Sequence, residues 1–235
     1  MLNKLIDDLV DANRILANED VVDAYGHVSL RHPDRPDHFL LSRSRSPELV
    51  ERGDILEFDS RGEPVQSGPT PYLERFIHAG IYAARPDVNV VIHSHADVVL
   101  PFTITDMPLR PVIHTASDMG AAAPVWDIAD KFGDTNLLVT NIEQGHDLAH
   151  CLACNSTVLM RGHGFTVVGR SLVEAVKTAV YMPRNARILL EALRLGHVKY
   201  LSEGEIAVRR EVKPDAPQMT RAWDYLKSRA DGERH

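Results

Sequence analysis

The spacing of apolar and polar positions predicts alternating helices and short strands along the chain. Apolar residues recur every three or four positions near the N-terminus, so residues 2–18 are predicted to form an amphipathic helix. Short apolar runs bounded by turn-forming residues predict strands. The predicted strands are 25–33, 38–42, a hairpin over 54–65, 88–93, 109–114, 136–140, 156–164 and 165–169.

Helices are predicted between several of these strands. Thr70 followed by Pro71 is typical of a helix start, with Thr70 as the N-cap and the proline at the first helical position. Pro86 is predicted to close this helix. Shorter helices are predicted over about 96–102 and 145–154.

A long helix is predicted near the C-terminal end. Ser171 with Glu174 three residues later predicts a capping box at its start. The helical pattern continues to about Leu195, and Pro183 is expected to kink it. Beyond Gly204 the chain is charged and less periodic, which indicates a C-terminal arm or helix.

The length and composition suit a single globular domain. The 235 residues are 44% hydrophobic and 25% charged, and they contain no repeat or low-complexity segment. We therefore expect one mixed α/β domain over residues 1–235, with about 204–235 as a C-terminal arm.

The charge pattern excludes several classes of partner. A net charge of −7 argues against binding to nucleic acids or to anionic membranes. No apolar run reaches the roughly 20 residues that span a bilayer, and the N-terminus carries acids where a signal peptide would be apolar. Cys151 and Cys154 have a C-x-x-C spacing without a second pair, so we interpret them as unpaired thiols of a cytoplasmic protein rather than as a redox or zinc motif.

Two histidines follow the apolar strand "VVI". Residues two apart in a strand point to the same side, so His93 and His95 present two imidazoles in parallel. Such a pair can bind a transition metal, although an isolated H-x-H also occurs at the solvated end of a strand.

A third histidine favours the metal interpretation. His163 lies between two glycines directly after the apolar run "STVLM". Glycines leave room for a close approach and allow backbone angles that other residues rarely adopt. Three neutral imidazoles with an open coordination position are typical of a catalytic metal site.

Glu74 is the candidate acid or base. It is placed one turn into the helix predicted to start at Thr70, one position too late for a capping box. Most helical glutamates are surface residues, but the apolar neighbours of Glu74 would raise its proton affinity if it were buried.

Together these residues resemble the class II aldolase/adducin family. The similar segments are "ERFIHAGIYAARPDVNVVIHSHADVV", the downstream "RGHG" and the early "YGHVSLR", and the resemblance runs from about residue 2 to 196. It implies a central, mostly antiparallel sheet flanked by helices on both faces, and a homotetramer with four-fold symmetry. It also implies that His93, His95 and His163 bind one divalent metal ion per subunit (zinc, manganese, cobalt or iron), with Glu74 as the catalytic acid or base beside it.

The departures from the family pattern concern the substrate. Sugar-phosphate aldolases of the family hold phosphate with Gly-Asn, Thr-Gly and Ser-Ser pairs. The matching pairs in this chain are Gly26-His27, Ser44-Arg45 and Tyr72-Leu73, and Ser44 and Tyr72 are predicted to contact the substrate. The phosphate site is therefore predicted to be lost, and Arg45 with Arg43 is predicted to bind a carboxylate through its guanidinium fork, although a solvated basic loop remains the alternative.

Two further histidines are candidates for the site. His27 replaces the phosphate-site asparagine and is predicted to donate to a carboxylate or move a proton, unless it only packs at a turn. His114, at the end of "LRPVIH", is predicted to face the metal and contact substrate. The remaining histidines are assigned to the surface or to packing: His32, His38, His78, His146, His150, His197 and His235.

The predicted function is a metal-dependent carbon–carbon lyase. The resemblance is closest to decarboxylases of aromatic catabolism that act on ortho-hydroxy aromatic or pyridine dicarboxylates, such as dihydroxyphthalate or 3-hydroxy-2-methylpyridine-4,5-dicarboxylate. An aldolase for a hydroxy-carbonyl substrate, phosphorylated or not, is the alternative. Iron-dependent, oxygenase-like chemistry is more distant, and an adducin-like binding module is the alternative that is not an enzyme.

Overall fold

Seven strands form a single mixed sheet in this computed structural model, which describes residues 2–211 and 216–232. The spatial order is β3-β2-β1-β4-β7-β6-β5, and every neighbouring pair is antiparallel except β5 and β6. The strands are β1 (His27–Arg31), β2 (Phe39–Ser42), β3 (Ile55–Phe58), β4 (Val90–Ser94), β5 (Val125–Trp126), β6 (Thr157–Met160) and β7 (Gly164–Gly169). This mostly antiparallel sheet confirms the predicted fold class.

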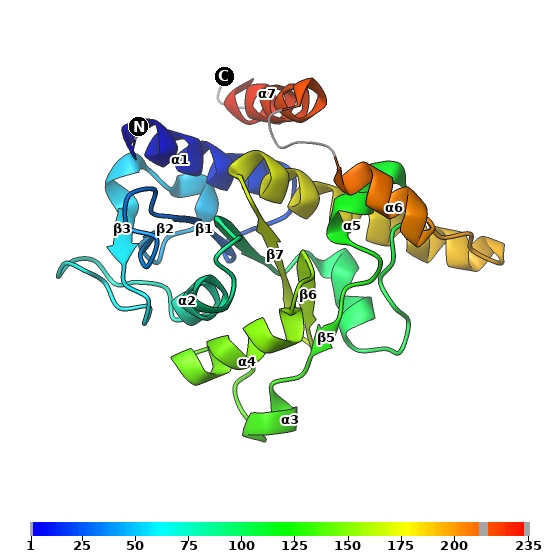
Figure 1. Cartoon of the computed structure of the whole chain (residues 1–235), viewed down its shortest axis with the longest axis horizontal. Coiled ribbons are helices and arrows are strands. Elements are labelled where there is room, and N and C mark those ends of the chain that lie inside the picture. Colours follow the sequence, from blue (N-terminus) through cyan, green and yellow to red (C-terminus); the bar gives the residue numbers. More distant parts are fainter. Residues whose placement is uncertain (1, 212–215, 233–235) are drawn as a thin grey trace.

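Helices cover both faces of the sheet (Figure 1). Helices α1 and α5 pack on one face, and α2 and α4 pack together on the other. The helices are α1 (Leu2–Asn18), α2 (Arg75–Ala84), α3 (Ala129–Phe132), α4 (Ile142–Leu152), α5 (Leu172–Leu195), α6 (Glu203–Arg210) and α7 (Pro217–Gly232). No helix within the described ranges is long and apolar enough to cross a membrane.

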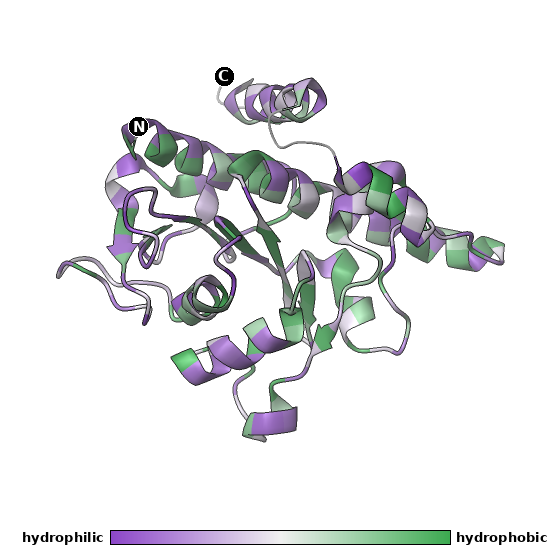
Figure 2. Ribbon diagram, viewed as in Figure 1, coloured by the Kyte–Doolittle hydropathy of each residue, from purple (hydrophilic) through white to green (hydrophobic). Residues whose placement is uncertain are grey.

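The central strand β4 divides the core into two layers. Val90 and Ile92 point toward α1 and α5, whereas Val91 points toward α2 and α4, as alternation along a strand requires. All three side chains are fully buried. Figure 2 shows that the central strands are largely hydrophobic. His93 shares the face of Val91, so it lies on the side of the sheet that α2 covers.

Two glycines bring α2 and α4 into backbone contact. A Cβ atom on Gly80 would lie 2.3 Å from the carbonyl carbon of Gly145, and one on Gly145 would lie 2.1 Å from the Phe76 carbonyl oxygen. Neither position can hold a side chain unless the helices separate. This close packing fixes α2, which follows Glu74 directly, over the sheet.

The predicted start of the helix after Thr70 is wrong. Helix α2 begins at Arg75, and Pro71 instead forms an antiparallel bridge with Arg43. The backbone N–H of Ser44 also donates to the Thr70 carbonyl. These backbone contacts hold Thr70 and Pro71 against the arginine-containing strand end, and a turn over 73–74 then leads into α2. The glutamate therefore precedes the helix rather than lying one turn inside it.

Two predicted strands, 109–114 and 136–140, are not strands in the structure. Side chains from other segments accept hydrogen bonds from the backbone N–H groups of these residues. Asn185 Oδ1 accepts from the N–H groups of Val112 and Ile113, and Gln144 Oε1 accepts from that of Thr140. The strands were predicted from apolar content alone. In the structure, hydrogen bonds to these side chains stand in place of hydrogen bonds to a neighbouring strand.

Three smaller differences concern one predicted hairpin, one short strand and one helix cap. In the predicted 54–65 hairpin only β3 is a strand, because the return segment meets it at a single Phe58–Pro64 bridge. The short parallel strand β5 was missed by sequence reasoning. The Ser171 side chain caps α5, but the Glu174 carboxylate accepts from the N–H of Arg170, so the predicted capping box does not form.

Beyond the predicted long helix, the described part of the chain contains the two helices α6 and α7. Helix α7 lies against α1 and α5, where Leu226 is 2% exposed. Lys227 Nζ contacts Asp11 Oδ2 at 2.5 Å, and Arg229 Nη1 contacts Glu19 Oε1 at 2.6 Å. These contacts attach the predicted arm to the N-terminal helix, while the division at residue 204 stays a prediction.

Candidate metal centre and active site

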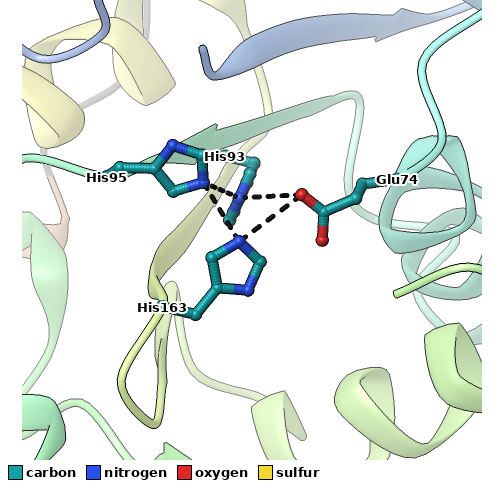
Figure 3. Close-up of side chains that lie close together, drawn as sticks. All are labelled: Glu74, His93, His95 and His163. Atoms are coloured by element: carbon teal, nitrogen blue, oxygen red, sulfur yellow. Dashed lines mark hydrogen bonds and ion pairs between the residues drawn. The ribbon is translucent and has the colours of Figure 1, made fainter. Parts of the chain in front are cut away.

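Four potential metal ligands converge where β4 ends (Figure 3). His93 lies in β4, His95 follows that strand, His163 lies between β6 and β7, and Glu74 immediately precedes α2. Nε2 of His95 is 2.8 Å from Nε2 of His93 and 3.1 Å from Nε2 of His163. Glu74 Oε2 is 3.6 Å from Nε2 of His93 and 3.4 Å from that of His163. We call these four residues the Glu–His cluster.

The donor set of the cluster fits a divalent transition metal. His93 Nδ1 lies 3.1 Å from the Phe165 carbonyl oxygen, which only accepts, so Nδ1 carries the hydrogen and Nε2 presents a lone pair. Burial, and then neighbouring His163, holds the pKa of His93 well below its ordinary value, and the same two causes lower the pKa of His95. Lone pairs of ring nitrogens this close repel each other unless a hydrogen or a cation lies between them. Ligands about 2.0–2.1 Å from a tetrahedral metal lie about 3.3 Å from one another, close to the distances seen here.

The glycines around His163 are required by the geometry. Gly162 has a φ of +62°, which favours glycine, and Gly164 lies directly against β4. A Cβ atom on Gly164 would lie 2.2 Å from the Ser94 carbonyl oxygen and 3.0 Å from the His95 ring. A larger residue would therefore displace β4 and His95 together.

Glu74 is held with one oxygen toward the histidines. Its Oε1 accepts a hydrogen bond of 3.0 Å from the backbone N–H of Val139, which leaves Oε2 facing His93 and His163. The residue is only 8% exposed. It also stands at the positive N-terminal end of α2, where a carboxylate is favoured. Glu74 can therefore ligate a metal or exchange a proton beside it.

His27 borders the cluster because of the strand register. It lies opposite His93 in the antiparallel pair of β1 and β4, and the two ring centroids are 5.1 Å apart. Its Nδ1 is 2.7 Å from Nε2 of His78. Burial, followed by His78, holds the pKa of His27 well below its ordinary value. His27 is therefore a neutral imidazole beside the candidate metal centre.

The segment 43–45, called the arginine loop, is anchored to one buried carboxylate. Arg43 Nε donates to Asp54 Oδ1 at 2.6 Å, and Arg45 Nη1 donates to Asp54 Oδ2 at 2.7 Å. Burial raises the pKa of Asp54, but hydrogen bonds from Arg43, the Glu51 N–H and Arg45 outweigh it, so the pKa lies below its ordinary value. Both predicted carboxylate anchors thus already hold a carboxylate of the chain itself.

Tyr72 connects the arginine loop to the histidines. Its hydroxyl donates to the Arg45 carbonyl, and its ring centroid lies 4.7 Å from that of His27. Ser44, another predicted substrate contact, is exposed. His114 is exposed at the start of the 3-10 helix η4 (His114–Met119) and is not part of the Glu–His cluster. Its predicted contact with substrate stays a prediction.

Sequence reasoning missed the roles of His78 and Asp54. His78 was assigned to the surface or to packing, yet it is fully buried and hydrogen-bonded to His27. The sequence does hold a signal, because Glu74, His78 and Tyr82 are spaced four apart and so share one face of a helix. No comparable spacing links Asp54 to the arginine loop.

The fold and the Glu–His cluster define a protein with a candidate catalytic metal centre at the end of the central strand of a mostly antiparallel sheet. The family model described as "Class II Aldolase and Adducin N-terminal domain" matches residues 7–190. The chain belongs to this family, as its sequence predicted.

Two of the relatives are named as decarboxylases. The chain is 41% identical over 204 residues to "Decarboxylase tropJ" of Talaromyces stipitatus, which covers 81% of this chain and 77% of that protein. It is 27% identical over 208 residues to the 3,4-dihydroxyphthalate decarboxylase of Arthrobacter keyseri, which covers 83% of this chain and 82% of that protein. A solved aldolase II superfamily protein from Pseudomonas syringae superposes with a TM-score of 0.81 at 20% identity, covering 98% of this chain and 93% of that one. The sequence prediction of a lyase is confirmed by the two decarboxylases, and the structure supports the fold.

Proposed function

We propose that this protein is a metal-dependent decarboxylase of ortho-hydroxy aromatic or pyridine dicarboxylates. The Glu–His cluster is the observation that carries the proposal, because three imidazoles and a buried glutamate converge at one point. Similarity to decarboxylase tropJ and to a 3,4-dihydroxyphthalate decarboxylase supports the reaction class and the type of substrate.

The cluster residues have separate tasks in this proposal. His93, His95 and His163 hold the divalent ion, which when bound supplies Lewis-acid stabilisation of negative charge on a substrate oxygen. Glu74 or His27 donates a proton to the ring carbon that bears the reacting carboxylate. The bond between that carbon and the carboxylate then breaks, carbon dioxide leaves, and the electron pair of the bond restores the aromatic ring.

The arginine loop is proposed to position the second carboxylate. Tyr72 contacts both the Arg45 carbonyl and the His27 ring, which supports a position of the loop near the Glu–His cluster. Asp54 uses Nε of Arg43 and Nη1 of Arg45. The remaining guanidinium nitrogens are the groups that would contact the substrate. The apolar pair Tyr72-Leu73 in place of two hydroxyls supports an aromatic dicarboxylate over a sugar phosphate.

The proposal also retains the predicted organisation. We propose a single domain that assembles as a cytoplasmic homotetramer with one divalent ion per subunit. The family resemblance supports the assembly. The two cysteines, which are free in the structure, support a reducing compartment.

A substrate panel tests the function directly. Chelator-treated protein is reloaded with zinc, manganese, cobalt or ferrous iron and incubated with dihydroxyphthalate, 3-hydroxy-2-methylpyridine-4,5-dicarboxylate and 2-keto-4-hydroxy acids. We expect carbon dioxide from a dicarboxylate, and none from a His95→Ala control. Release of pyruvate or an aldehyde instead identifies an aldolase, and no turnover with any metal contradicts both enzymes.

A further inference from the structure

A buried hydrogen-bonded chain leads from His27 away from the Glu–His cluster. His27 Nδ1 is 2.7 Å from His78 Nε2, and His78 Nδ1 is 2.6 Å from Ser29 Oγ. Ser29 Oγ is 2.7 Å from the hydroxyl of Tyr82, which is 3.3 Å from the carbonyl oxygen of Asn89. We call His27, His78, Ser29 and Tyr82 the histidine relay.

The fold places the relay between the sheet and α2. His27 and Ser29 are two apart in β1 and point to the same face, while His78 and Tyr82 are four apart in α2. All four are at most 7% exposed. The ring of Phe39 stacks on His78 with centroids 6.1 Å apart. A buried polar group must find partners inside the protein, so each hydrogen of the relay has a defined acceptor.

The end of the relay determines its direction. The Asn89 carbonyl only accepts, so the Tyr82 hydroxyl donates to it and accepts from Ser29. The reverse arrangement would leave two oxygen atoms 3.3 Å apart with no hydrogen between them.

Each further hydrogen follows from this direction. Ser29 donates to Tyr82 and therefore accepts from His78 Nδ1. His78 then carries its hydrogen on Nδ1, and its Nε2 accepts from His27 Nδ1. Burial lowers the pKa of His78 to about 3, so this ring is neutral and has one donor and one acceptor. His27 is left with a lone pair on Nε2.

We infer that His78, through Ser29 and Tyr82, fixes His27 as the Nδ1–H tautomer, so that its Nε2 accepts a hydrogen bond from the hydroxyl of the substrate. This inference rests on the proposed function and refines it. With no hydrogen on Nε2, His27 selects for the ortho-hydroxyl group, and Glu74 is left as the proton donor to the ring carbon. His78 acts as a positioning residue that never touches the substrate.

The tautomer of His27 is measured by ¹⁵N NMR on histidine-labelled, zinc-loaded protein, with the His27 signals assigned by their loss in His27→Gln. We expect the wild type to show a protonated Nδ1 and an unprotonated Nε2. A protonated Nε2 in the wild type overturns the inference. This readout does not depend on turnover.

Tyr82→Phe tests whether the relay sets the tautomer. Without the hydroxyl, Ser29 is free to donate to His78 Nδ1, which reverses the chain and moves the hydrogen of His27 to Nε2. Ser29→Ala is the second variant, and Tyr181→Phe on α5 is the matched control that removes the same atom elsewhere. We expect a changed tautomer in Tyr82→Phe and none in the control. An unchanged His27 tautomer in both relay variants overturns the inference.

Ligand preference tests the consequence for specificity. The wild type is expected to bind 3-hydroxyphthalate about 10-fold more tightly than its methyl ether, because the ether cannot donate to Nε2. Tyr82→Phe should lose this preference, while Tyr181→Phe keeps it. Equal preference in wild type and Tyr82→Phe contradicts the role of the relay. Failure of the decarboxylase assay would instead remove the proposed function and leave the tautomer result standing.

Discussion

The Glu–His cluster and the arginine loop differ in whether their polar groups already have a partner of opposite charge. In the cluster, ring nitrogens of His93, His95 and His163 face one another at contact distance. In the arginine loop, the buried carboxylate of Asp54 already pairs with two guanidinium groups. The cluster can therefore bind a cation from outside, whereas the arginine loop is already paired within the chain and offers a substrate only its remaining donors.

This difference predicts which of the two regions contributes more to binding of the metal and the substrate. Interactions made by a preorganised but unsatisfied cluster contribute strongly when their partner binds. A guanidinium already engaged by Asp54 gains less from a second carboxylate, because Asp54 neutralises part of its positive charge and occupies some of its donors. Disrupting the cluster should thus have much larger effects than disrupting the loop.

The largest effect is expected from loss of a cluster imidazole. His95→Ala removes a partly exposed ligand without opening the core. Bound metal should fall toward zero and turnover should drop by about 10³-fold or more, since Lewis-acid stabilisation contributes several kcal/mol. Elemental analysis and carbon dioxide release measure both. His114→Ala, an exposed histidine outside the cluster, is the control, and a His95→Ala protein with full metal content would contradict the comparison.

Glu74→Gln should separate chemistry from metal binding. The amide oxygen can still accept from the Val139 N–H, so the side chain is expected to stay in place. Turnover should fall by about 10²-fold because the proton donor is lost, while metal content stays near normal. Loss of the metal in this variant would show that the glutamate is a required ligand and not the acid.

Arg45→Ala tests how much the arginine loop contributes to substrate binding. We expect the KM for a dicarboxylate to rise about 10-fold, the size of one charged hydrogen bond, while a monocarboxylate analogue changes less than about 2-fold. Steady-state kinetics with both substrates measures the ratio. Equal changes for the two substrates would mean that Arg45 serves only to pair with Asp54.

The smallest expected effect concerns Asp54 and pH. The folded pKa of Asp54 lies below its unfolded value of about 3.9, so its stabilising contribution is present above about pH 4 and is lost as the pH falls through the folded pKa. At about pH 6 Asp54→Asn should lower the Tm by about 2–4 °C, on the order of 1 kcal/mol. The gap should narrow steadily as the pH of the scans is lowered below about 4. A constant gap across this range would show that the carboxylate charge is not what stabilises the loop.

Local patterns predicted much of the fold and the residues of the Glu–His cluster. The alternation in β4 placed His93 and His95 at a strand end, and the flanking glycines marked His163. The predicted start of α2 was wrong because Pro71, expected in the first turn of the helix, instead forms a backbone bridge with Arg43. A contact between segments so far apart leaves no trace in local helix-start signals.

The environment of the candidate site was harder to predict than its ligands. The pairing of the arginine loop depends on Asp54, and the orientation of His27 depends on His78, which looked like a core position of an amphipathic helix. Both depend on strand register and on how α2 packs over the sheet. Residue type suggested which groups have chemistry, but only the tertiary structure shows which partners they have.

X-ray absorption spectroscopy of the zinc-loaded protein tests the central claim most directly. If the three histidines bind one cation, the spectrum should show about three imidazole nitrogens at about 2.0–2.1 Å, with one zinc per chain. A zinc ion surrounded only by oxygen ligands, or an unchanged spectrum in His95→Ala, would contradict convergence of His93, His95 and His163 on a single metal.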